Sequence, residues 1–199
     1  MADVINAKDN GGGGFLPHPE GQFGAVCVDT IDLGERLKTW GNKPKVSPMC
    51  ALVFMTGETN ESTGHLHDVH QEFTVSMFES ASLRLFLEAW RGRSYTSEQA
   101  KEGVPLHKLV GQPALISVEH KKSAKGRTYA VIKSIMPLPK GMVAPSVDLS
   151  AYERAPFWEE RKQGYRDELA RFRSNNAPAA DDYVGMPENG VDDVDNLPF

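Results

Sequence analysis

Five separate segments of this chain carry the side-chain patterns of β-strands, and this feature restricts the fold more than any other. From residue 72 to 77, EFTVSM, polar and apolar side chains alternate, and a period of two is typical of a strand with one buried face. Residues 49–55 form an unbroken apolar run, which also predicts a strand. The expected strands cover residues 23–31, 49–55, 72–78, 114–120 and 128–135.

An amphipathic helix is expected between the third and fourth strands. Apolar side chains fall at i, i+3, i+4 and i+7 from Leu83 to Trp90, which places them on one buried stripe. Ser80 is suited to cap the start of this helix and Gly92 to end it. Trp90 is therefore assigned to the core.

Two further helical segments are expected after Gly92. Thr96, three positions before Gln99, predicts a capping box at the start of a short helical turn. Residues 155–173, APFWEERKQGYRDELARFR, place their large apolar side chains roughly along one side, as in a surface helix. We expect this last helix to lie back on the domain, and contact with another subunit stays an alternative.

Three strands, a helix and two strands make up the element order of an oligonucleotide-binding (OB) barrel. We therefore expect a mainly β protein: a five-stranded OB-fold barrel with a helix between strands 3 and 4, a C-terminal helix and a disordered acidic tail. The expected organisation is a flexible arm at 1–20, the OB domain at 21–141, a linker and helix at 142–173 and the tail at 174–199.

The two ends have compositions that do not support a packed core. The first twenty residues are polar and are broken by Gly11–Gly14, Pro17 and Pro19, so a flexible arm is expected. Residues 174–199 hold six acidic and no basic side chains. A segment this polar cannot bury enough apolar surface to offset the entropy lost on ordering.

Positive charge gathers in two loops of the expected barrel. Residues 84–140 carry 11 basic and 4 acidic side chains, although the whole chain has a net charge of -5. In OB barrels, nucleic acid crosses strands two and three between the loop joining strands 1 and 2 and the loop joining strands 4 and 5. Here those loops, 35–45 and 121–127, hold eight cations and one Trp.

Single-stranded nucleic acid is bound by cations along its phosphates and by planar side chains on which bases stack. Phe54 lies in the expected binding sheet, although an aromatic in an apolar run is more often part of a core. The remaining aromatic candidates lie near basic residues. The candidate DNA-binding residues are Arg36, Lys38, Trp40, Lys43, Lys45, Phe54, Arg91, Arg93, Tyr95, Lys121, Lys122, Lys125, Arg127 and Tyr129.

The last residues of the chain form a candidate site for a protein partner. Three aspartates precede an apolar tip that carries the free carboxylate, and such an end suits a pocket that is apolar inside and basic at its rim. The same tail can also compete with DNA for the basic groove through screened Coulomb attraction. The partner-binding candidates are Asp192, Asp193, Asp195, Leu197, Pro198 and Phe199.

Two parts of the sequence resemble known single-stranded-DNA-binding proteins. The acidic end closing on Pro198 and Phe199 is similar to the tips with which bacterial members recruit replication and repair enzymes. Residues 73–96, FTVSMFESASLRLFLEAWRGRSYT, and 129–141, YAVIKSIMPLPKG, resemble the OB-fold members of bacteriophages and prophages. The resemblance implies sequence-independent binding of single-stranded DNA in phage replication, recombination or repair, with no catalytic residue, cofactor or metal.

The strongest rival is the segment GHLHDVH, in which His65, His67 and His70 lie beside Asp68. Closely spaced imidazoles can bind zinc, and a zinc ion with an open position activates water for hydrolysis. A zinc-dependent hydrolase therefore stays an alternative, as does a protein-interaction module that binds no DNA. Nucleotide hydrolysis has no support, because no GxxxxGK[ST] motif occurs.

The location of the protein is expected from its cysteines and its apolar runs. Cys27 and Cys50 lie in apolar segments and are expected to be reduced core residues of a cytosolic protein. No run approaches the roughly 18 apolar residues of a membrane span, and residues 1–14 lack the apolar centre of a signal peptide. The expected location is the cytoplasm of a bacterial host cell, and a homo-oligomer is compatible with the sequence.

Overall fold

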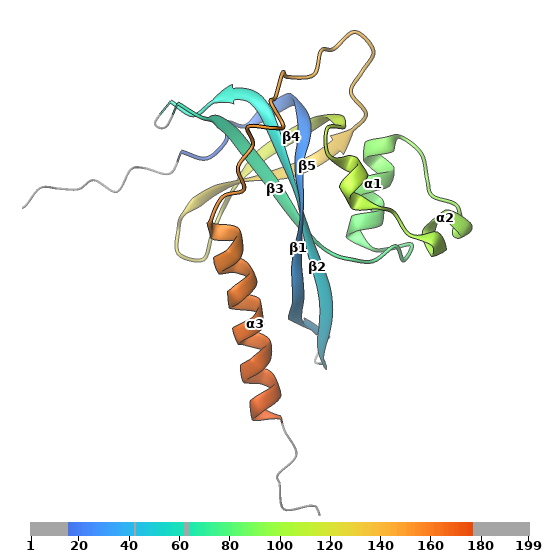
Figure 1. Ribbon diagram of the computed structural model, residues 1–199, viewed down its shortest axis with the longest axis vertical. Coiled ribbons are helices and arrows are strands. Elements are labelled where there is room, and N and C mark those ends of the chain that lie inside the picture. The colour runs from blue at the N-terminus through green and yellow to red at the C-terminus, as the bar shows by residue number, and fades with distance from the viewer. Residues whose placement is uncertain (1–15, 42, 62–63, 177–199) are drawn as a thin grey trace, which may run out of the picture.

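The computed structural model describes residues 16–41, 43–61 and 64–176, apart from the side chain of Trp40. The fold is mainly β, with a five-stranded antiparallel sheet in the order β3-β2-β1-β4-β5 and a C-terminal helix (Figure 1). The strands are β1 Gly21–Trp40, β2 Lys43–Thr59, β3 Leu66–Thr74, β4 Pro113–Lys122 and β5 Thr128–Met136. The helices are α1 Ser82–Arg91, α2 Ser97–Glu102, the 3-10 turn η1 Leu106–Leu109 and α3 Phe157–Asn175.

The sheet is not closed into a barrel. Within the described part of the chain, β3 pairs only with β2 and β5 only with β4, so no ladder of hydrogen bonds joins the two outer strands. The expectation of a mainly β domain with five strands and a C-terminal helix is confirmed. None of the helices in the described ranges combines the length and the apolar character that crossing a bilayer requires.

The loop expected at 35–45 is instead the end of a long β-hairpin, so the expected limits of the first two strands are wrong. The third strand, expected at 72–78, is Leu66–Thr74. Lys38 pairs with Lys45 and Trp40 with Lys43 across the two strands. Gly41 lies between them with φ +60, a left-handed conformation that favours glycine. In Figure 1 this hairpin extends past the other strands, because the described ladder between β2 and β3 begins only at Met49.

Both faces of β1 and β2 are covered, which explains the unbroken apolar run at 49–55. Successive side chains of a strand point to opposite faces. Cys50, Leu52 and Phe54 belong to one buried cluster with α1, whereas Ala51 and Val53 belong to another with α3. Figure 1 shows α1 and α3 on opposite sides of the sheet. We call these the α1-side core and the α3-side core.

Helix α3 lies back on the sheet, as expected. Trp158 has no exposed surface, and Tyr165 and Leu169 are 6% exposed. Arg154, just before the helix, donates two hydrogen bonds of 2.7 and 2.8 Å to the carboxylate of Asp29 on β1. At the other end, Arg173 approaches Glu35 to 3.3 Å. The helix is therefore fastened along the middle of β1.

The local signals around α1 and α2 are mostly confirmed. Helix α1 ends at Gly92 in the left-handed conformation, and Thr96 with Gln99 forms the expected capping box of α2. The start of α1 was expected at Ser80, but Ala81 is the N-cap and its side chain makes no capping hydrogen bond.

Two further expectations concern the cysteines and the N-terminal arm. Cys27 and Cys50 are buried as expected, and burial raises the pKa of their thiols to about 12 and about 11. The flexible arm was expected to reach residue 20, but His18 is 2% exposed and its ring shares a 2.7 Å hydrogen bond with Thr56 on β2. Most of the arm, residues 1–15, lies outside the described residues.

Candidate nucleic-acid interface

A groove of about 910 Å³ runs between the β1–β2 hairpin and the segment that joins β3 to α1. Its walls carry lysines, hydroxyl side chains and one aromatic ring, and no Asp or Glu is among the described residues that line it. We call it the lysine groove. The lining residues that could contact a ligand are Lys38, Lys43, Lys45, Thr74, Ser76 and Phe78.

The lysines of this groove share one face of the hairpin because of the strand register. Lys38 lies directly opposite Lys45, and Lys43 lies two positions from Lys45 on the same strand. Like charges directly opposite one another destabilise a sheet, and no ion pair of these lysines occurs in the described ranges. Lys38 Nζ donates a 2.8 Å hydrogen bond to Thr74 Oγ1. The uncompensated charge suits an anionic ligand.

Phe78 supplies an aromatic surface in the same groove. Its side chain is 72% exposed. An apolar ring in this position gives the fold no stabilisation from burial. The backbone N–H of Phe78 donates to Ser76 Oγ at 3.3 Å. Phe78 was not among the expected DNA-binding residues. The sequence does carry a signal for it, because Phe78 follows Thr74 and Ser76 on the polar side of the alternation. A lone aromatic on a polar face is a candidate contact.

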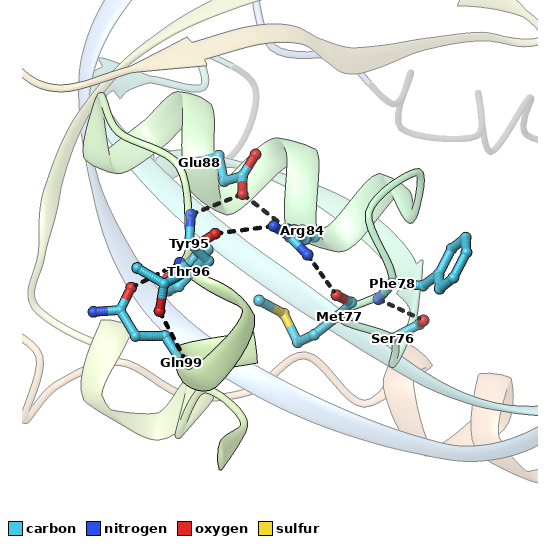
Figure 2. A network of polar contacts seen from close by, with 8 residues as sticks. All are labelled: Ser76, Met77, Phe78, Arg84, Glu88, Tyr95, Thr96 and Gln99. Carbon is cyan, nitrogen blue, oxygen red and sulfur yellow. Dashed lines mark hydrogen bonds and ion pairs between the residues drawn. The ribbon is translucent and has the colours of Figure 1, made fainter. Parts of the chain in front are cut away.

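A network of polar contacts centred on Arg84 fixes the segment that bears Phe78 (Figure 2). The guanidinium donates to the Met77 carbonyl at 3.2 Å, to the Tyr95 carbonyl at 3.0 Å and to Glu88 Oε1 at 2.9 Å. Glu88 Oε1 also accepts a 2.8 Å hydrogen bond from the Tyr95 N–H. The hydrogen bond from Arg84 lowers the pKa of Glu88. Arg84 thus joins the β3–α1 segment to the α1–α2 segment.

The assignment of Phe54 as a stacking residue is wrong in this structure. Its side chain has no exposed surface, and its ring centroid lies 5.1 Å from that of Trp90 and 6.1 Å from that of Phe86. Strand alternation turns Phe54 toward the α1-side core, so a base cannot reach it. Trp90 is a core residue, as expected.

Arg36 is not in the groove either, although it lies on the hairpin. Its guanidinium carbon is 4.7 Å from the ring centroid of Tyr165, and Nη1 donates to Tyr165 Oη at 3.3 Å. Tyr165 belongs to α3, and its hydroxyl donates a 2.6 Å hydrogen bond to Glu72 on β3. Arg36 therefore contributes to docking of α3.

Three candidate DNA-binding residues at the end of α1 and just after it do not line the groove: Arg91, Arg93 and Tyr95. The guanidinium carbon of Arg91 lies 4.1 Å from the ring centroid of Tyr95, and Tyr95 packs against the α1-side core. Arg93 is exposed. The side chain of Trp40 and the six partner-binding candidates of the tail lie outside the described residues.

The second group of expected cations lies on the β4–β5 hairpin, away from the lysine groove. Lys121 and Lys122 end β4, and Lys125 and Arg127 lie in the turn before Tyr129 of β5. The start of β1 pairs with β4, whereas its far end forms the hairpin of the lysine groove. The sheet face between them is covered by α3. The expectation of one cleft with a cation cluster on each rim is therefore wrong.

No protein-family model, curated protein or solved structure matches this chain. The geometry of the lysine groove is therefore the basis for assigning a function.

The three histidines expected as zinc ligands do not converge. His67 approaches His18, with ring centroids 5.3 Å apart, whereas the ring centroid of His70 lies 4.7 Å from that of Trp158 in the α3-side core. Residues 67 and 70 are separated by an odd number of positions, so they face opposite sides of β3. Within the described ranges, no group of three His, Cys, Asp or Glu side chains could hold a metal ion.

The buried histidines predict a loss of stability in acid. Burial lowers the pKa of His18 and of His70, so the unfolded chain binds protons more readily than the folded one. Their contribution is complete above the unfolded pKa of about 6.5 and is lost as the pH falls below it. The urea concentration at the midpoint of unfolding should therefore decrease when the pH is lowered from about 7.5 to about 5.5. It should decrease less in His70→Phe. A pH dependence of the urea midpoint in His70→Phe equal to that of the wild-type protein would contradict this account.

Proposed function

We propose that the protein binds single-stranded DNA with little sequence preference through the lysine groove. The observation that carries the proposal is one groove lined by three lysines and an exposed Phe78, with no carboxylate among its described lining residues. This combination matches the two requirements of single-strand binding, cations for the phosphates and a planar surface for the bases.

Binding would be an equilibrium process without a chemical step. Lys38, Lys43 and Lys45 would neutralise phosphates and release their counterions, so that affinity falls as salt rises. The ring of Phe78 would stack on a base, which contributes roughly 1 to 3 kcal/mol per base and tolerates any sequence. In a duplex the bases are already stacked on one another, so a duplex would lose the contribution from stacking on Phe78.

The strand order supports an OB fold as the scaffold. The order β3-β2-β1-β4-β5 is that of an OB barrel opened between β3 and β5, and such barrels are often only partly closed. In OB folds the ligand crosses the face of strands 2 and 3. Here α3 covers the middle of that face, so the proposed site is displaced toward the hairpin.

The proposed setting is phage DNA replication, recombination or repair in the cytoplasm of a host cell. The acidic tail, with Asp192, Asp193 and Asp195 before Leu197, Pro198 and Phe199, would bind replication or recombination proteins through its apolar tip. No cofactor or metal is proposed.

Phe78→Ala is expected to weaken binding of labelled oligo(dT) by about 5-fold to 150-fold, because it removes one base stack of roughly 1 to 3 kcal/mol. Thermal unfolding should be unchanged, since the ring is 72% exposed. The matched control is Leu85→Ala on α1, which is 52% exposed and does not line the groove. Fluorescence anisotropy at one fixed salt concentration measures both variants.

Two outcomes would contradict this proposal. If the wild-type protein binds no oligo(dT) at low salt, or binds a duplex of the same length equally well, it is not a single-strand-binding protein. If Phe78→Ala and Leu85→Ala have equal effects, Phe78 is not the stacking surface.

A further inference from the structure

The β4–β5 hairpin carries a second basic surface with its own exposed aromatic ring. Tyr129 is 39% exposed and lies directly opposite Lys121 in the strand register, so both side chains point to the same face. Lys122, Lys125 and Arg127 are exposed at the end of the hairpin, and no described ion pair involves them. We call the group Lys121, Lys122, Lys125, Arg127 and Tyr129 the β4–β5 surface.

Two acidic side chains lie beside this surface, and both already have partners. Glu20 Oε1 accepts a 2.7 Å hydrogen bond from the backbone N–H of His120. Glu119 approaches Lys133 to 3.1 Å and Lys121 to 3.7 Å. The hydrogen bond from Lys133 is the main cause that lowers the pKa of Glu119. Three cations at the end of the hairpin therefore stay without a described carboxylate partner, the same condition that distinguishes the lysine groove.

Helix α3 separates the two basic surfaces. It buries Trp158 and Tyr165 against the middle of β1 and β2, and the Arg161 guanidinium lies 3.1 Å from Glu72 on β3. Residues 141–173 hold six basic and six acidic side chains, so this region offers a polyanion no net attraction. A DNA strand bound in the lysine groove therefore cannot reach the β4–β5 surface by following the β-sheet.

We propose that the β4–β5 surface is a second, separate binding site for single-stranded nucleic acid, which engages the same strand as the lysine groove. This inference rests on the proposed function of that groove. When one flexible DNA strand contacts both sites, binding is bivalent. Once the DNA is bound at the first site, its effective concentration at the second site is high. The protein then prefers strands that are long enough to reach both sites.

The test compares strand lengths in three variants of the full chain. Labelled oligo(dT) of about 4 nucleotides would occupy one site, whereas strands well beyond about 16 nucleotides, the upper site size of a single OB fold, can reach both. The first variant changes Lys122, Lys125 and Arg127 to Ala. The second changes Lys38, Lys43 and Lys45 to Ala. The control changes the exposed Lys101, Lys108 and Lys140 to Ala, which removes the same charge elsewhere.

For the β4–β5 variant we expect about 100-fold weaker binding of the long strand, at the lower end of the gain from linked sites. Binding of the short strand should change by less than about twofold relative to the control variant, because the groove still holds it. The groove variant should weaken binding at both lengths.

Each alternative result has a separate meaning. An equal loss at both lengths in the β4–β5 variant would overturn the inference, because the two surfaces would then form one site. Equality with the control at both lengths would overturn it too, since the surface would not bind DNA. In both cases the groove variant still tests the proposed function, which fails if the groove variant matches the control or if the wild-type protein binds no DNA strand.

Discussion

Replacing Phe54 with alanine is expected to lower the free energy of unfolding by about 3 to 5 kcal/mol, the usual cost of truncating a buried Phe to Ala. The ring has no exposed surface and packs against Trp90 and Phe86 in the α1-side core. Its removal leaves a cavity between the sheet and α1, because close-packed interiors relax only in part. Urea unfolding followed by circular dichroism measures the change.

Phe54→Leu separates the structural role from a role in stacking. Leucine keeps most of the buried apolar volume, so stability should fall less than in the alanine variant, and oligo(dT) affinity should be unchanged. Phe78→Leu is the matched comparison at an exposed position, where we expect weaker DNA binding with little loss of stability. If Phe54→Leu weakened DNA binding as much as Phe78→Leu, the assignment of Phe54 to the core alone would be wrong.

Phe54 also shows why the strands could be predicted from the sequence, whereas the burial of each strand face could not. An unbroken apolar run at 49–55 indicates a strand, and that prediction is confirmed within a longer strand, Lys43–Thr59. Which face of the strand meets α1 and which meets α3 depends on contacts between segments far apart in the chain. Phe54 and Val53 are neighbours in sequence, yet they belong to different buried clusters.

The hairpin at 35–45 could not be recognised from apolar alternation, because it extends past its neighbours into solvent. Leu37 and Val46, which pair across the strands, are half-buried, and the surrounding positions are mostly charged or polar. A two-stranded arm of this kind is stabilised by pairing more than by burial. Lys38, Lys43 and Lys45 were expected in a loop, whereas they lie on the paired strands and line the lysine groove.

Docking of α3 is the other event that local patterns could not locate. The apolar side of residues 155–173 predicts that the helix packs on something, and the buried Trp158 confirms it. The pattern does not say which surface the helix covers. It covers the face on which a continuous path between the two basic loops was expected, and it engages Arg36 through Tyr165.

Changing Lys38, Lys43 and Lys45 together to alanine is expected to have the largest effect on DNA binding. At low salt the affinity for a single strand should fall about 100-fold or more, because each charge-assisted contact contributes roughly 1 kcal/mol or more. The slope of log affinity against log salt should become shallower by about 2, since each contacted phosphate of a single strand contributes about 0.7. Anisotropy titrations at several salt concentrations measure both quantities.

Stability should move in the opposite direction from binding in this variant. Lys38 and Lys45 face each other across the hairpin, so their removal relieves a like-charge contact, partly offset by loss of the hydrogen bond to Thr74. The unfolding midpoint should therefore stay constant or rise. Residues that repel one another in the free protein but strengthen a complex are typical of a binding site.

The control for the charge change is the variant with Lys101, Lys108 and Lys140 replaced by alanine, all at exposed positions outside the groove. It lowers the net charge of the protein by the same amount as the groove variant does. If DNA were bound by long-range attraction alone, the two variants would lose the same affinity. A local contact predicts instead that the control keeps nearly the full salt slope of the wild-type protein. Equal slopes in the two variants would mean that DNA responds to the overall field of the protein and not to the lysine groove.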